Sequence, residues 1–436
     1  MECARKRPMS EPGTKVHFIG IAGVGMSALA QLLHHQKYEV SGSDSAWFPT
    51  LLALEKLGMA VPIGYEAAHV PEDAQYVVYT DAVTKDNPER VRAEELDIPQ
   101  LSYFEMLGRI SEGKTTIAVA GTHGKTTTTG MLARILRDAG ASPSAIVGSI
   151  ITDFESNYLP GESDLFVVEA CEYNRHFLNL TPRILVVTNL EFDHTDYFVD
   201  LEDVQKAFRT LMMKVPENGA IVTDTENPNI IPLLEGLAAH VVHYPSEPAF
   251  LLSLPGEFNK MNARAAAAAA KAVMPELTNE KIAHSLAEFK GSWRRFEYKG
   301  KNSKGVDVYD DYAHHPTAVR ETLRALRAQT KGKVIVAFHP HLYSRTRDLL
   351  DGFARSFEDA DRIFIAPIYA ARETDDGSVS SELLAARIRD EGGNAEAVNS
   401  LEQLETLLSV AGEPGDSIMT MGAGDVYKVA DAIVVN

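Results

Sequence analysis

A loop near residue 120 carries the strongest chemical signal in the sequence. It consists of Gly121, Thr122, His123, Gly124, Lys125, Thr126 and Thr127. Glycines let the backbone wrap closely around an anion, the lysine supplies positive charge, and a threonine hydroxyl can bind Mg²⁺. Apolar residues before the loop predict a strand, and the residues after it predict a helix that ends near Arg137. Free N–H groups at the start of such a helix attract phosphate, so the loop predicts a nucleoside triphosphate site.

This loop departs from the general phosphate-binding motif at one position. Val119 stands where that motif has its first glycine, so the match is to a shorter Gly-x-x-Gly-Lys-Thr form. The alternative is an ordinary strand–turn–helix with a surface lysine. The strand before the loop and the helix after it favour the triphosphate site.

Polar side chains follow two further predicted strands, and they could complete this site. Glu169 ends one of these strands, and His194 follows the other. Ligands collect at the carboxyl ends of parallel strands, so both side chains should converge on phosphates held by Lys125. A carboxylate and an imidazole can bind Mg²⁺ directly or through water. We therefore predict Thr126, Glu169 and His194 as metal ligands.

A second glycine-rich turn lies near the start of the chain. Gly20, Gly23 and Gly25 follow a strand predicted over 15–19 and open a helix, and Asp44 comes after the next strand. An acid at that place can accept a hydrogen bond from a ribose hydroxyl. The spacing Gly-x-x-Gly-x-Gly is not that of dinucleotide-binding proteins, so a tight turn without a ligand stays open as the alternative.

Other polar groups permit two interpretations each. Asn259 and Asn262 share one face of an alanine-rich helix, where they form a polar handle, or Asn259 caps the helix. Arg345 and Arg347 follow a predicted strand and mark either a second site edge or a solvated surface.

We expect no zinc at the histidine pair. His314 and His315 lack the carboxylate and the ligand spacing of a zinc site.

Bulk composition limits the class of protein. The formal net charge of −19 argues against a general binder of nucleic acid or anionic membranes. Cys3 and Cys171 make no disulfide framework, which favours a reducing cytoplasm. Acids flank Cys171 and should raise its pKa, so we do not expect a nucleophile there. No apolar run is long enough to span a membrane.

Alternating strands and helices predict an α/β protein with mainly parallel sheets. Its 436 residues suit roughly two to four domains. We predict a Rossmann-like N-terminal domain, a central P-loop-type ATPase domain and a Rossmann-like C-terminal domain. The expected limits are a flexible tail at 1–14 and domains at 15–110, 111–292 and 293–436.

In their order along the chain, these motifs resemble the Mur ligases of peptidoglycan synthesis, a family in which three domains bind a UDP-sugar, ATP and an amino acid. The motifs are the loop at 121–127, Glu169, Asp193-His194, Asn259 and Asn262, Arg294-Arg295-Phe296, and Asp311-Tyr312-Ala313-His314. The resemblance covers nearly the whole chain. It implies that a substrate carboxylate attacks the γ-phosphate of ATP, and that an amine then displaces phosphate from the acyl phosphate.

Within the family, the stretches 17–27, 41–44 and above all 339–348 resemble the member that joins UDP-N-acetylmuramate to L-alanine. A ligase that recycles murein tripeptide shares the early motifs but differs in the last stretch, and it is the first alternative. A non-catalytic nucleotide-binding relative is the second. We expect ATP and Mg²⁺ as cofactors, a monomer or weak homodimer, and neither nucleic acid nor membrane as partner.

The resemblance also implies roles for individual residues. The catalytic group would be Lys125, Glu169, His194 and Arg295. ATP would contact the loop together with Asn259, Asn262 and Asp311. The substrates would contact Gly20, Gly23, Gly25, Met26, Ser27, Ser43, Asp44, His341, Tyr343, Arg345 and Arg347.

Three features depart from the family pattern. Phe258 stands where a histidine is frequent, and Cys171 stands where an aspartate is frequent. The segment from Tyr244 to Pro255 is shorter than the antiparallel insertion usual in the family.

Overall fold

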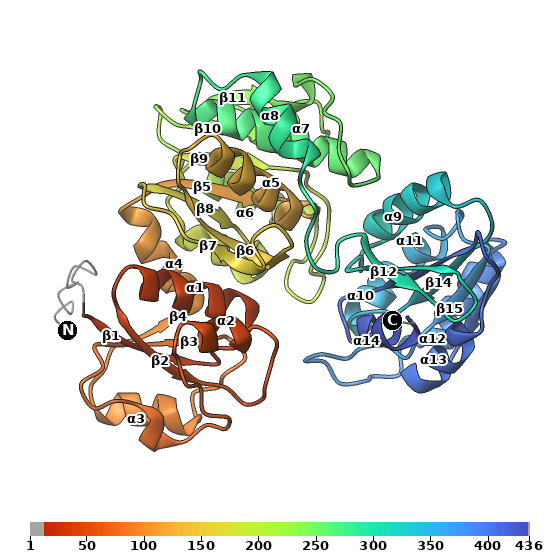
Figure 1. Ribbon diagram of the computed structural model, residues 1–436, viewed down its shortest axis with the longest axis horizontal. Helices are drawn as coiled ribbons and strands as arrows, with labels where there is room; N and C mark the ends of the chain where they lie inside the picture. The colour runs from red at the N-terminus through yellow and green to blue at the C-terminus, as the bar shows by residue number, and fades with distance from the viewer. Residues whose placement is uncertain (1–12, 435–436) are drawn as a thin grey trace.

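The computed structural model describes residues 13–434, which form three lobes, each built around its own sheet (Figure 1). Every lobe alternates strands with covering helices, which confirms the predicted α/β class with mainly parallel sheets. Residues 1–12 of the predicted tail lie outside the described range. Gly13 is tied down, because its N–H donates to the carbonyl of Lys37 at 2.8 Å. No helix in the described part has the length and apolarity needed to cross a bilayer.

The N-terminal lobe contains a four-stranded parallel sheet in the order β2-β1-β3-β4. α1 and α2 pack on one face of this sheet and α3 on the other. Asn87 caps α3 by accepting from two backbone N–H groups, and Pro88 starts its first turn. The elements are β1 Lys15–Ile19, α1 Val24–His35, β2 Glu39–Ser43, α2 Leu51–Lys56, η1 Ala67–His69, β3 Tyr76–Tyr79, α3 Pro88–Glu95 and β4 Gln100–Ser102.

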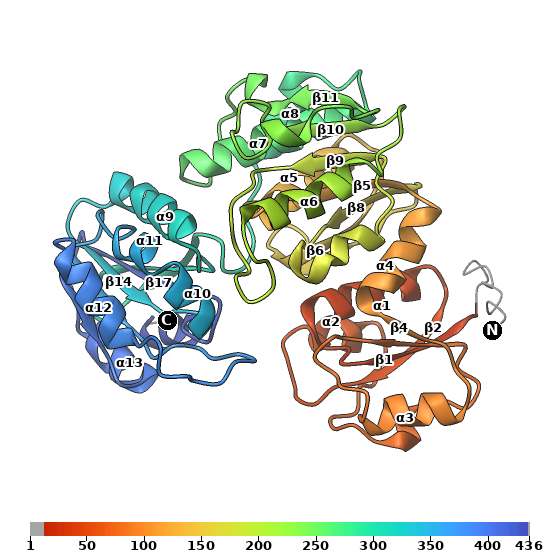
Figure 2. The same ribbon diagram turned by 180° about the vertical axis from the view of Figure 1, so that it is seen from behind.

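The central lobe contains a seven-stranded sheet in the order β11-β10-β9-β5-β8-β6-β7, in which only the edge strand β7 is antiparallel. α5 and α7 cover one face and α6 the other (Figure 2). The elements are α4 Tyr103–Glu112, β5 Thr115–Ala120, α5 Lys125–Asp138, β6 Ser144–Ile151, β7 Ser156–Leu159, β8 Leu165–Glu169, η2 Tyr173–Asn179, β9 Ile184–Val187, α6 Leu201–Met212, β10 Ala220–Thr223, η3 Ile231–Leu233, β11 His240–His243, η4 Tyr244–Ser246, α7 Glu257–Val273 and α8 Asn279–Ala287.

Small residues let α5 and α7 approach the sheet closely. The alanines at 265–270 of α7 are all buried. On α5, a Cβ at Gly130 would lie 2.8 Å from Ile151 Cδ1 and 3.1 Å from Phe289 Cζ. Larger side chains here would push α5 away from the sheet, and with it the loop that precedes it.

The C-terminal lobe contains a six-stranded sheet in the order β12-β13-β17-β14-β15-β16, with only β12 antiparallel. α9, α11 and α12 pack on one face, and α13 and α14 on the other. The elements are β12 Glu297–Lys301, β13 Asp307–Asp311, α9 Pro316–Gln329, β14 Val334–Phe338, α10 Tyr343–Asp348, α11 Leu350–Ala354, β15 Arg362–Ile365, α12 Ser381–Asp390, β16 Ala395–Ala397, α13 Leu401–Ser409, β17 Ser417–Met421 and α14 Tyr427–Ile433.

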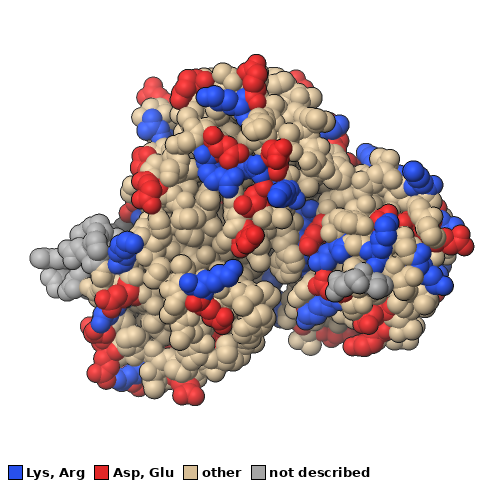
Figure 3. Space-filling view, in the orientation of Figure 1, with Lys and Arg blue, Asp and Glu red and all other residues tan. Residues whose placement is uncertain are grey.

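Polar contacts fix the lobes to one another. Between the N-terminal and central lobes, the Asn157 amide donates to the Ser27 hydroxyl at 3.0 Å. Between the central and C-terminal lobes, the Arg345 guanidinium donates to Asp193 at 2.8 Å. On the face seen in Figure 3, acidic and basic side chains are interspersed over all three lobes.

Candidate active site

The loop at 121–124 joins β5 to α5 and has the predicted strand–turn–helix form. Gly121 and Gly124 have φ angles of +133° and +79°, which L side chains rarely adopt. No side chain caps the N-terminus of α5, so the N–H groups of its first turn remain available to an anion. A Cβ at Gly124 would lie 2.2 Å from Asn262 Oδ1, so the loop also presses against α7.

The segment after β9 holds this loop in shape. The His123 N–H donates to Asn189 Oδ1 at 2.8 Å, and the Thr188 hydroxyl donates to the His123 carbonyl at 2.6 Å. The Glu191 N–H donates to the Thr122 hydroxyl at 2.8 Å. These contacts leave the loop preorganised, so little ordering is needed when an anion binds.

Lys125 is paired with an acid that the sequence analysis did not select. Its Nζ lies 2.9 Å from Glu172 Oε2 and donates to the Gly121 carbonyl at 2.6 Å. Burial is the largest single effect and opposes the charge on Lys125, but Glu172 and the other acidic groups nearby together outweigh it and raise the pKa of the lysine. Burial likewise opposes ionisation of Glu172, while Lys125 and His194 hold the pKa of its carboxyl below the ordinary value. The two groups therefore form a buried ion pair at neutral pH.

Thr126 is the meeting point of groups from two lobes. Its hydroxyl donates to Glu169 Oε1 at 3.1 Å and accepts from Arg295 Nη2 at 3.2 Å. Glu169 Oε2 accepts from the Gly148 N–H at 2.8 Å, which fixes the carboxylate. The structure thus brings Thr126, Glu169 and Arg295 together, and a hydroxyl beside a carboxylate is an oxygen donor pair that suits Mg²⁺.

His194 lies beside Glu172 within the same cavity. Its Nε2 is 3.7 Å from Glu172 Oε1, and its ring is 5.0 Å from that of Tyr173. The backbone at His194 has φ +54°, a strained value for a residue with a side chain. Such strain is a frequent feature of functional sites, where the surrounding structure supports it.

The two asparagines of α7 face the loop, and neither caps the helix. Gly256 occupies the N-cap position. The Asn259 amide donates to the Pro255 carbonyl at 2.7 Å, and the Asn262 amide donates to Asn259 Oδ1 at 3.4 Å. Both asparagines are buried, so the polar-handle interpretation agrees with these contacts better than capping does.

Asp311 approaches the same space from the C-terminal lobe. Its carboxylate accepts from the N–H groups of Phe296 and Ala313, each at 2.7 Å. Burial raises the pKa of Asp311 above its ordinary value. Next to it, Arg294 is fully enclosed and donates to Asp310 at 2.8 Å, which anchors the segment that carries Arg295.

One cavity of about 570 Å³ joins these groups. It is lined by Val24 of the N-terminal lobe, by the loop with Glu169 and Asn259 of the central lobe, and by Asp311 and His341 of the C-terminal lobe. A cavity of this size accommodates a nucleotide and part of a second substrate.

The stretch at 341–347 does not act as one unit. Arg345 is only 2% exposed, donates to Asp193 at 2.8 Å and to His341 Nδ1 at 3.0 Å, and lines the cavity. Tyr343 and Arg347 lie outside the lining of that cavity. Arg347 instead pairs with Asp348 at 2.8 Å and with Asp376 at 3.4 Å on the surface. The sequence analysis grouped these side chains, but the helical turn of α10 sends them in different directions.

Arg345 controls the charge of its surroundings. Burial opposes ionisation of Asp193, but the guanidinium holds the pKa of this carboxyl well below its usual range. Burial and the Arg345 charge lower the pKa of His341 to about 3. His341 is therefore a neutral imidazole that accepts the guanidinium N–H.

The glycine-rich turn of the N-terminal lobe is held by its own side chains. Asp44 Oδ2 accepts from the Ala22 N–H at 2.8 Å. The Ser43 hydroxyl is fully buried and donates to Glu89 at 2.6 Å, so it is closed to a ligand. These contacts give both residues a structural task that the sequence analysis did not foresee.

The remaining residues of this turn lie around the start of α1. Gly20 has φ +84°, and a Cβ there would lie 2.5 Å from Thr80 Cγ2. A Cβ at Gly25 would lie 2.6 Å from Tyr103 Cζ, so the glycine makes room for an aromatic ring. Met26 and Ser27 are buried. Gly23 is the N-cap of α1 and makes no side-chain cap, so the first N–H groups of this helix remain available to an anion.

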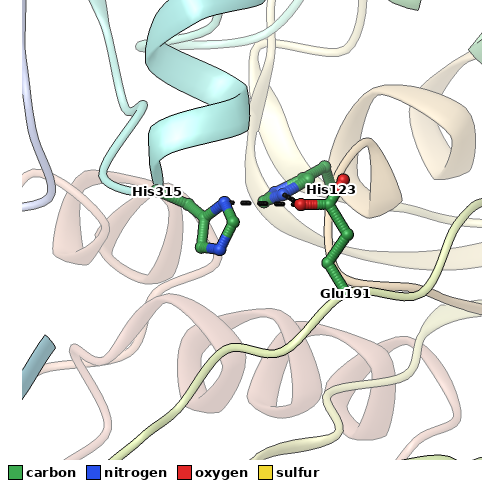
Figure 4. A group of neighbouring side chains, drawn as sticks. All are labelled: His123, Glu191 and His315. Carbon is green, nitrogen blue, oxygen red and sulfur yellow. Dashed lines mark ion pairs between the residues drawn. The ribbon is translucent and has the colours of Figure 1, made fainter. Parts of the chain in front are cut away.

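A second cluster lies beside the phosphate loop and consists of His123, Glu191 and His315 (Figure 4). Glu191 Oε2 is 3.8 Å from His123 Nε2 and 3.7 Å from His315 Nδ1. Burial opposes ionisation of Glu191, but His123 and other donors lower the pKa of its carboxyl to about 2. The sequence analysis expected no carboxylate near the histidine pair. The residues next to the pair in the sequence indeed supply none, but Glu191 reaches His315 from the central lobe.

Sequence reasoning did not select Glu172 or Glu191, and it named Asp193, the partner of Arg345, only as part of a motif and without a role. All three acids follow strand ends of the central sheet, so the strand-end rule that selected Glu169 could have included them. The strand-end rule could not tell which of these acids are important, because the path of the chain after β8 depends on left-handed residues in η2, Asn174 and Arg175, that no sequence pattern predicts. Burial, followed by the nearby Glu172, raises the pKa of the Cys171 thiol to about 12, which is the direction predicted from the flanking acids.

Known proteins share this arrangement over the whole chain. Residues 15–115 match the Mur ligase family catalytic domain, residues 119–249 the Mur ligase middle domain, and residues 294–424 the Mur ligase glutamate ligase domain. A UDP-N-acetylmuramate–L-alanine ligase of Desulfitobacterium hafniense is 41% identical over 96% of this chain and 99% of its own length. One from Clostridium botulinum is 36% identical over 96% of this chain and 97% of its own.

Solved structures have the same fold. The UDP-N-acetylmuramate–alanine ligase of Thermotoga maritima superposes with a TM-score of 0.76 at 26% identity, over 95% of this chain and 97% of its own. A murein peptide ligase of Psychrobacter arcticus superposes with a TM-score of 0.72 at 24% identity, over 97% and 100% of the two chains, and this shows the fold alone. With a phosphate loop, a cavity shared by three lobes and these full-length relatives, the chain belongs to the Mur ligase family.

Proposed function

We propose that this chain joins the carboxylate of UDP-N-acetylmuramate to the amine of L-alanine, with hydrolysis of ATP to ADP and phosphate, in the synthesis of peptidoglycan precursors. Relatives with this activity in their names match it end to end at 36% to 41% identity. The structural observation that carries the proposal is the contact of Arg295, from the start of the C-terminal lobe, with Thr126 on the phosphate loop. The nucleotide-linked substrate and ATP are cytoplasmic metabolites, which places the reaction there.

The reaction needs two displacements. In the first, a carboxylate oxygen attacks the γ-phosphorus of ATP, ADP leaves, and an acyl phosphate forms. In the second, the alanine amine attacks the acyl carbon, phosphate leaves with the bonding pair, and the nitrogen loses a proton. Phosphorylation is needed because a carboxylate is a poor electrophile. Positioning and neutralisation of charge supply most of the catalysis in such transfers.

The loop residues perform the neutralisation. N–H groups of the first turn of α5 and the Lys125 ammonium bind the β- and γ-phosphates. Arg295 lies 3.2 Å from Thr126 Oγ1, so its charge faces the phosphoryl group in transfer. The Lys125 ammonium moves away from Glu172 as it turns to the phosphates. The Glu172 carboxylate keeps its place and orients the ammonium from there.

Mg²⁺ fits the oxygen donors at this place. The Thr126 hydroxyl and the Glu169 carboxylate would hold it, 3.1 Å apart, with His194 as a further donor within the cavity. When bound, the ion would supply positive charge that neutralises the charge developing on the phosphate oxygens.

The substrates occupy the rest of the cavity. Asn259, Asn262 and Asp311 face the loop and hold ATP. The open N-terminus of α1 binds an anionic group of the UDP-sugar. His341 and Arg345 line the cavity on the C-terminal side and stay candidates for the amino-acid side. Because Arg345 is already paired with Asp193, its role there is that of a positioning residue.

The test is an assay of ADP release with UDP-N-acetylmuramate and a panel of amino acids and peptides. L-Alanine should give the fastest turnover, with some glycine and serine used, because discrimination of one small group is worth only ~1–3 kcal/mol. Lys125→Ala should lower turnover about 10³-fold or more. A preference for murein tripeptide would instead assign the recycling reaction. Binding of ATP without ADP release on any acceptor would make the chain a non-catalytic relative.

A further inference from the structure

The side chains of His123, Glu191 and His315 line the cavity, and the reaction described above gives these side chains no task of their own. One potential ligand atom from each residue lies within 4.8 Å of the other two. His123 belongs to the phosphate loop and Glu191 to the segment after β9, while His315 is the N-cap of α9 in the C-terminal lobe. Figure 4 shows both imidazoles turned towards the same carboxylate, and the two ring centroids are 4.7 Å apart. The cluster therefore takes its possible ligand atoms from both the central and the C-terminal lobe.

The histidine His315 is prepared as a ligand. Its Nε2–H donates to the Phe192 carbonyl at 3.2 Å, which places the proton on Nε2 and leaves Nδ1 as an acceptor 3.7 Å from Glu191 Oε2. Metal-ligating histidines commonly have this arrangement, in which a carbonyl holds the other ring nitrogen. The Thr317 N–H contacts Nδ1 at 3.3 Å, and this weak contact is the one that a cation would replace.

The other two ligands are equally placed. His123 Nε2 is shielded from solvent and has no hydrogen-bond partner among the described residues. An unpaired buried ring nitrogen is costly, and a cation would satisfy it. Glu191 Oε2 accepts from the Thr317 hydroxyl at 2.7 Å, which holds the carboxylate while leaving further lone pairs free.

The spacing suits a tetrahedral cation after a small adjustment. Zn²⁺ binds imidazole nitrogen and carboxylate oxygen at about 2.0–2.2 Å, which puts ligand atoms about 3.3 Å apart. Here the oxygen lies 3.7 Å and 3.8 Å from the two nitrogens. The three ligand atoms lie within 4.8 Å of one another, so side-chain movements of up to about 1.5 Å would close the site. Two imidazoles with one carboxylate select Zn²⁺ and similar transition metals over Mg²⁺, which prefers oxygen ligands.

We propose that His123, Glu191 and His315 form a binding site for a transition-metal dication of the Zn²⁺ class, and that the ion joins the phosphate loop to the C-terminal lobe. A fourth position remains open to water. Because His123 lies two residues before Lys125, occupancy would restrain the loop that binds phosphate. The site is separate from the Mg²⁺ ligands, which lie on the Thr126 side of the loop.

The experiment uses the full chain without nucleotide, freed of metal by a chelator and then dialysed against ZnCl₂. Metal analysis should find one zinc per chain in the wild type. Glu191→Gln and His315→Ala should weaken binding at least about tenfold. The control His35→Ala removes a histidine that faces a single carboxylate, Glu162, at 3.2 Å, and should bind zinc like the wild type. His194→Ala should also retain the zinc, which separates this site from the Mg²⁺ site.

A spectroscopic measurement completes the test. CoCl₂ in place of ZnCl₂ should give the intense visible absorption of four-coordinate cobalt in the wild type and lose it in Glu191→Gln. If His315→Ala fails to fold, circular dichroism will show it, and Glu191→Gln decides alone. Equal zinc binding by the wild type and Glu191→Gln would overturn the proposal. The proposal would also be overturned if the wild type retained no more zinc than Glu191→Gln at every zinc concentration.

Discussion

At the scale of single residues, the chemistry centres on the ammonium of Lys125. This group must be buried in the protein without nucleotide, and it must be able to contact a phosphate when ATP binds. The structure solves this with Glu172, which is 3% exposed and lies 2.9 Å from Lys125 Nζ. The carboxylate keeps the lysine charged despite burial. When phosphate arrives, the lysine exchanges one anion for another. The desolvation of Lys125 is therefore already complete before substrate binds.

This exchange makes a prediction for Glu172→Gln. The variant leaves a buried cation without its partner, so the free energy of unfolding of the nucleotide-free protein should fall by about 3 kcal/mol. Bound ADP supplies a new anion, so ADP should stabilise the variant more than it stabilises the wild type. Urea unfolding with and without ADP measures both effects.

Glu202→Gln is the matched control for that measurement. Glu202 forms an ion pair with Lys206 of similar length, 2.8 Å, but on the exposed surface of α6. Water screens such a pair, so its loss should change the unfolding curve little. Equal effects of the two substitutions would show that Glu172 does not hold a buried charge.

The sequence identified the residues of the loop because glycine, lysine and threonine at fixed spacing have few other uses. It also selected Arg295, which the structure brings to Thr126. It could not separate Arg345 from Arg347, because both look alike in a charged stretch. Only the packing of α10 against the central lobe decides that one is buried and the other is on the surface.

At the scale of elements, α5 carries the site, and glycines stand at both of its ends. Gly124 at the N-cap has φ +79°, and Gly140 just beyond the C-terminus has φ +82°. The two backbones are alike, but their surroundings differ. A Cβ at Gly124 would lie 2.2 Å from Asn262 Oδ1, whereas nothing lies within 4 Å of one at Gly140.

Substitution of each of these two glycines by alanine should therefore separate the effect of backbone strain from the effect of a changed site geometry. Each substitution places a side chain in a left-handed backbone and should lower the free energy of unfolding by about 1–2 kcal/mol. Gly124→Ala must also displace Asn262 and deform the loop, so it should abolish ATP binding measured by calorimetry. Gly140→Ala should bind ATP as the wild type does. If both variants bind ATP equally, the loop does not need its observed shape.

The main strands and helices were predictable because parallel strands buried on both faces are continuous apolar runs. The edge strands β4, β7, β11, β12 and β16 were not predicted, and neither was the interior strand β6. β12 reads Glu-Tyr-Lys-Gly-Lys and β16 reads Ala-Glu-Ala, which carry no apolar run. Neighbouring strands, rather than their own composition, make these segments extended, so the sequence alone cannot reveal them.

At the scale of the whole molecule, the C-terminal lobe depends on neutral buried histidines. Burial is the largest cause that lowers the pKa of His339 to about 4 and that of His341 to about 3. An unfolded imidazole has a pKa of about 6.5. Below that pH the unfolded chain takes up protons that the folded chain refuses, so stability is complete above about pH 6.5 and falls as the pH drops towards 4.

Thermal unfolding at constant ionic strength should show this loss. The midpoint should change little between pH 8 and 7 and fall steadily from pH 6.5 to 5, where carboxylates are still largely ionised. His341→Gln keeps a hydrogen-bonding group beside Arg345 and should make the fall shallower. A midpoint that stays constant down to pH 5 would contradict the assignment of these histidines as neutral.

The docking of the C-terminal lobe on the central lobe depends on the buried pair of Arg345 and Asp193. Both side chains are nearly inaccessible, and Nε lies 2.8 Å from Oδ1. Asp193 directly precedes His194, and Arg345 donates to no other carboxylate among the described residues. Docking of the two lobes thus buries one charged side chain from each lobe. Neither side chain can be hydrated while the lobes are docked. Breaking one partner should therefore favour separation of the lobes over local rearrangement.

Asp193→Asn tests this coupling, because it keeps the shape and removes the charge. Arg345 then prefers water, so the lobes should open, the radius of gyration from X-ray scattering should rise, and kcat should fall more than the affinity for ATP, since the loop itself is intact. Asp351→Asn is the control, because Asp351 pairs with Arg387 at 2.6 Å on the surface of the C-terminal lobe alone. It should leave both the scattering and the turnover unchanged. If Asp193→Asn scatters like the wild type, shape complementarity rather than this ion pair holds the lobes together.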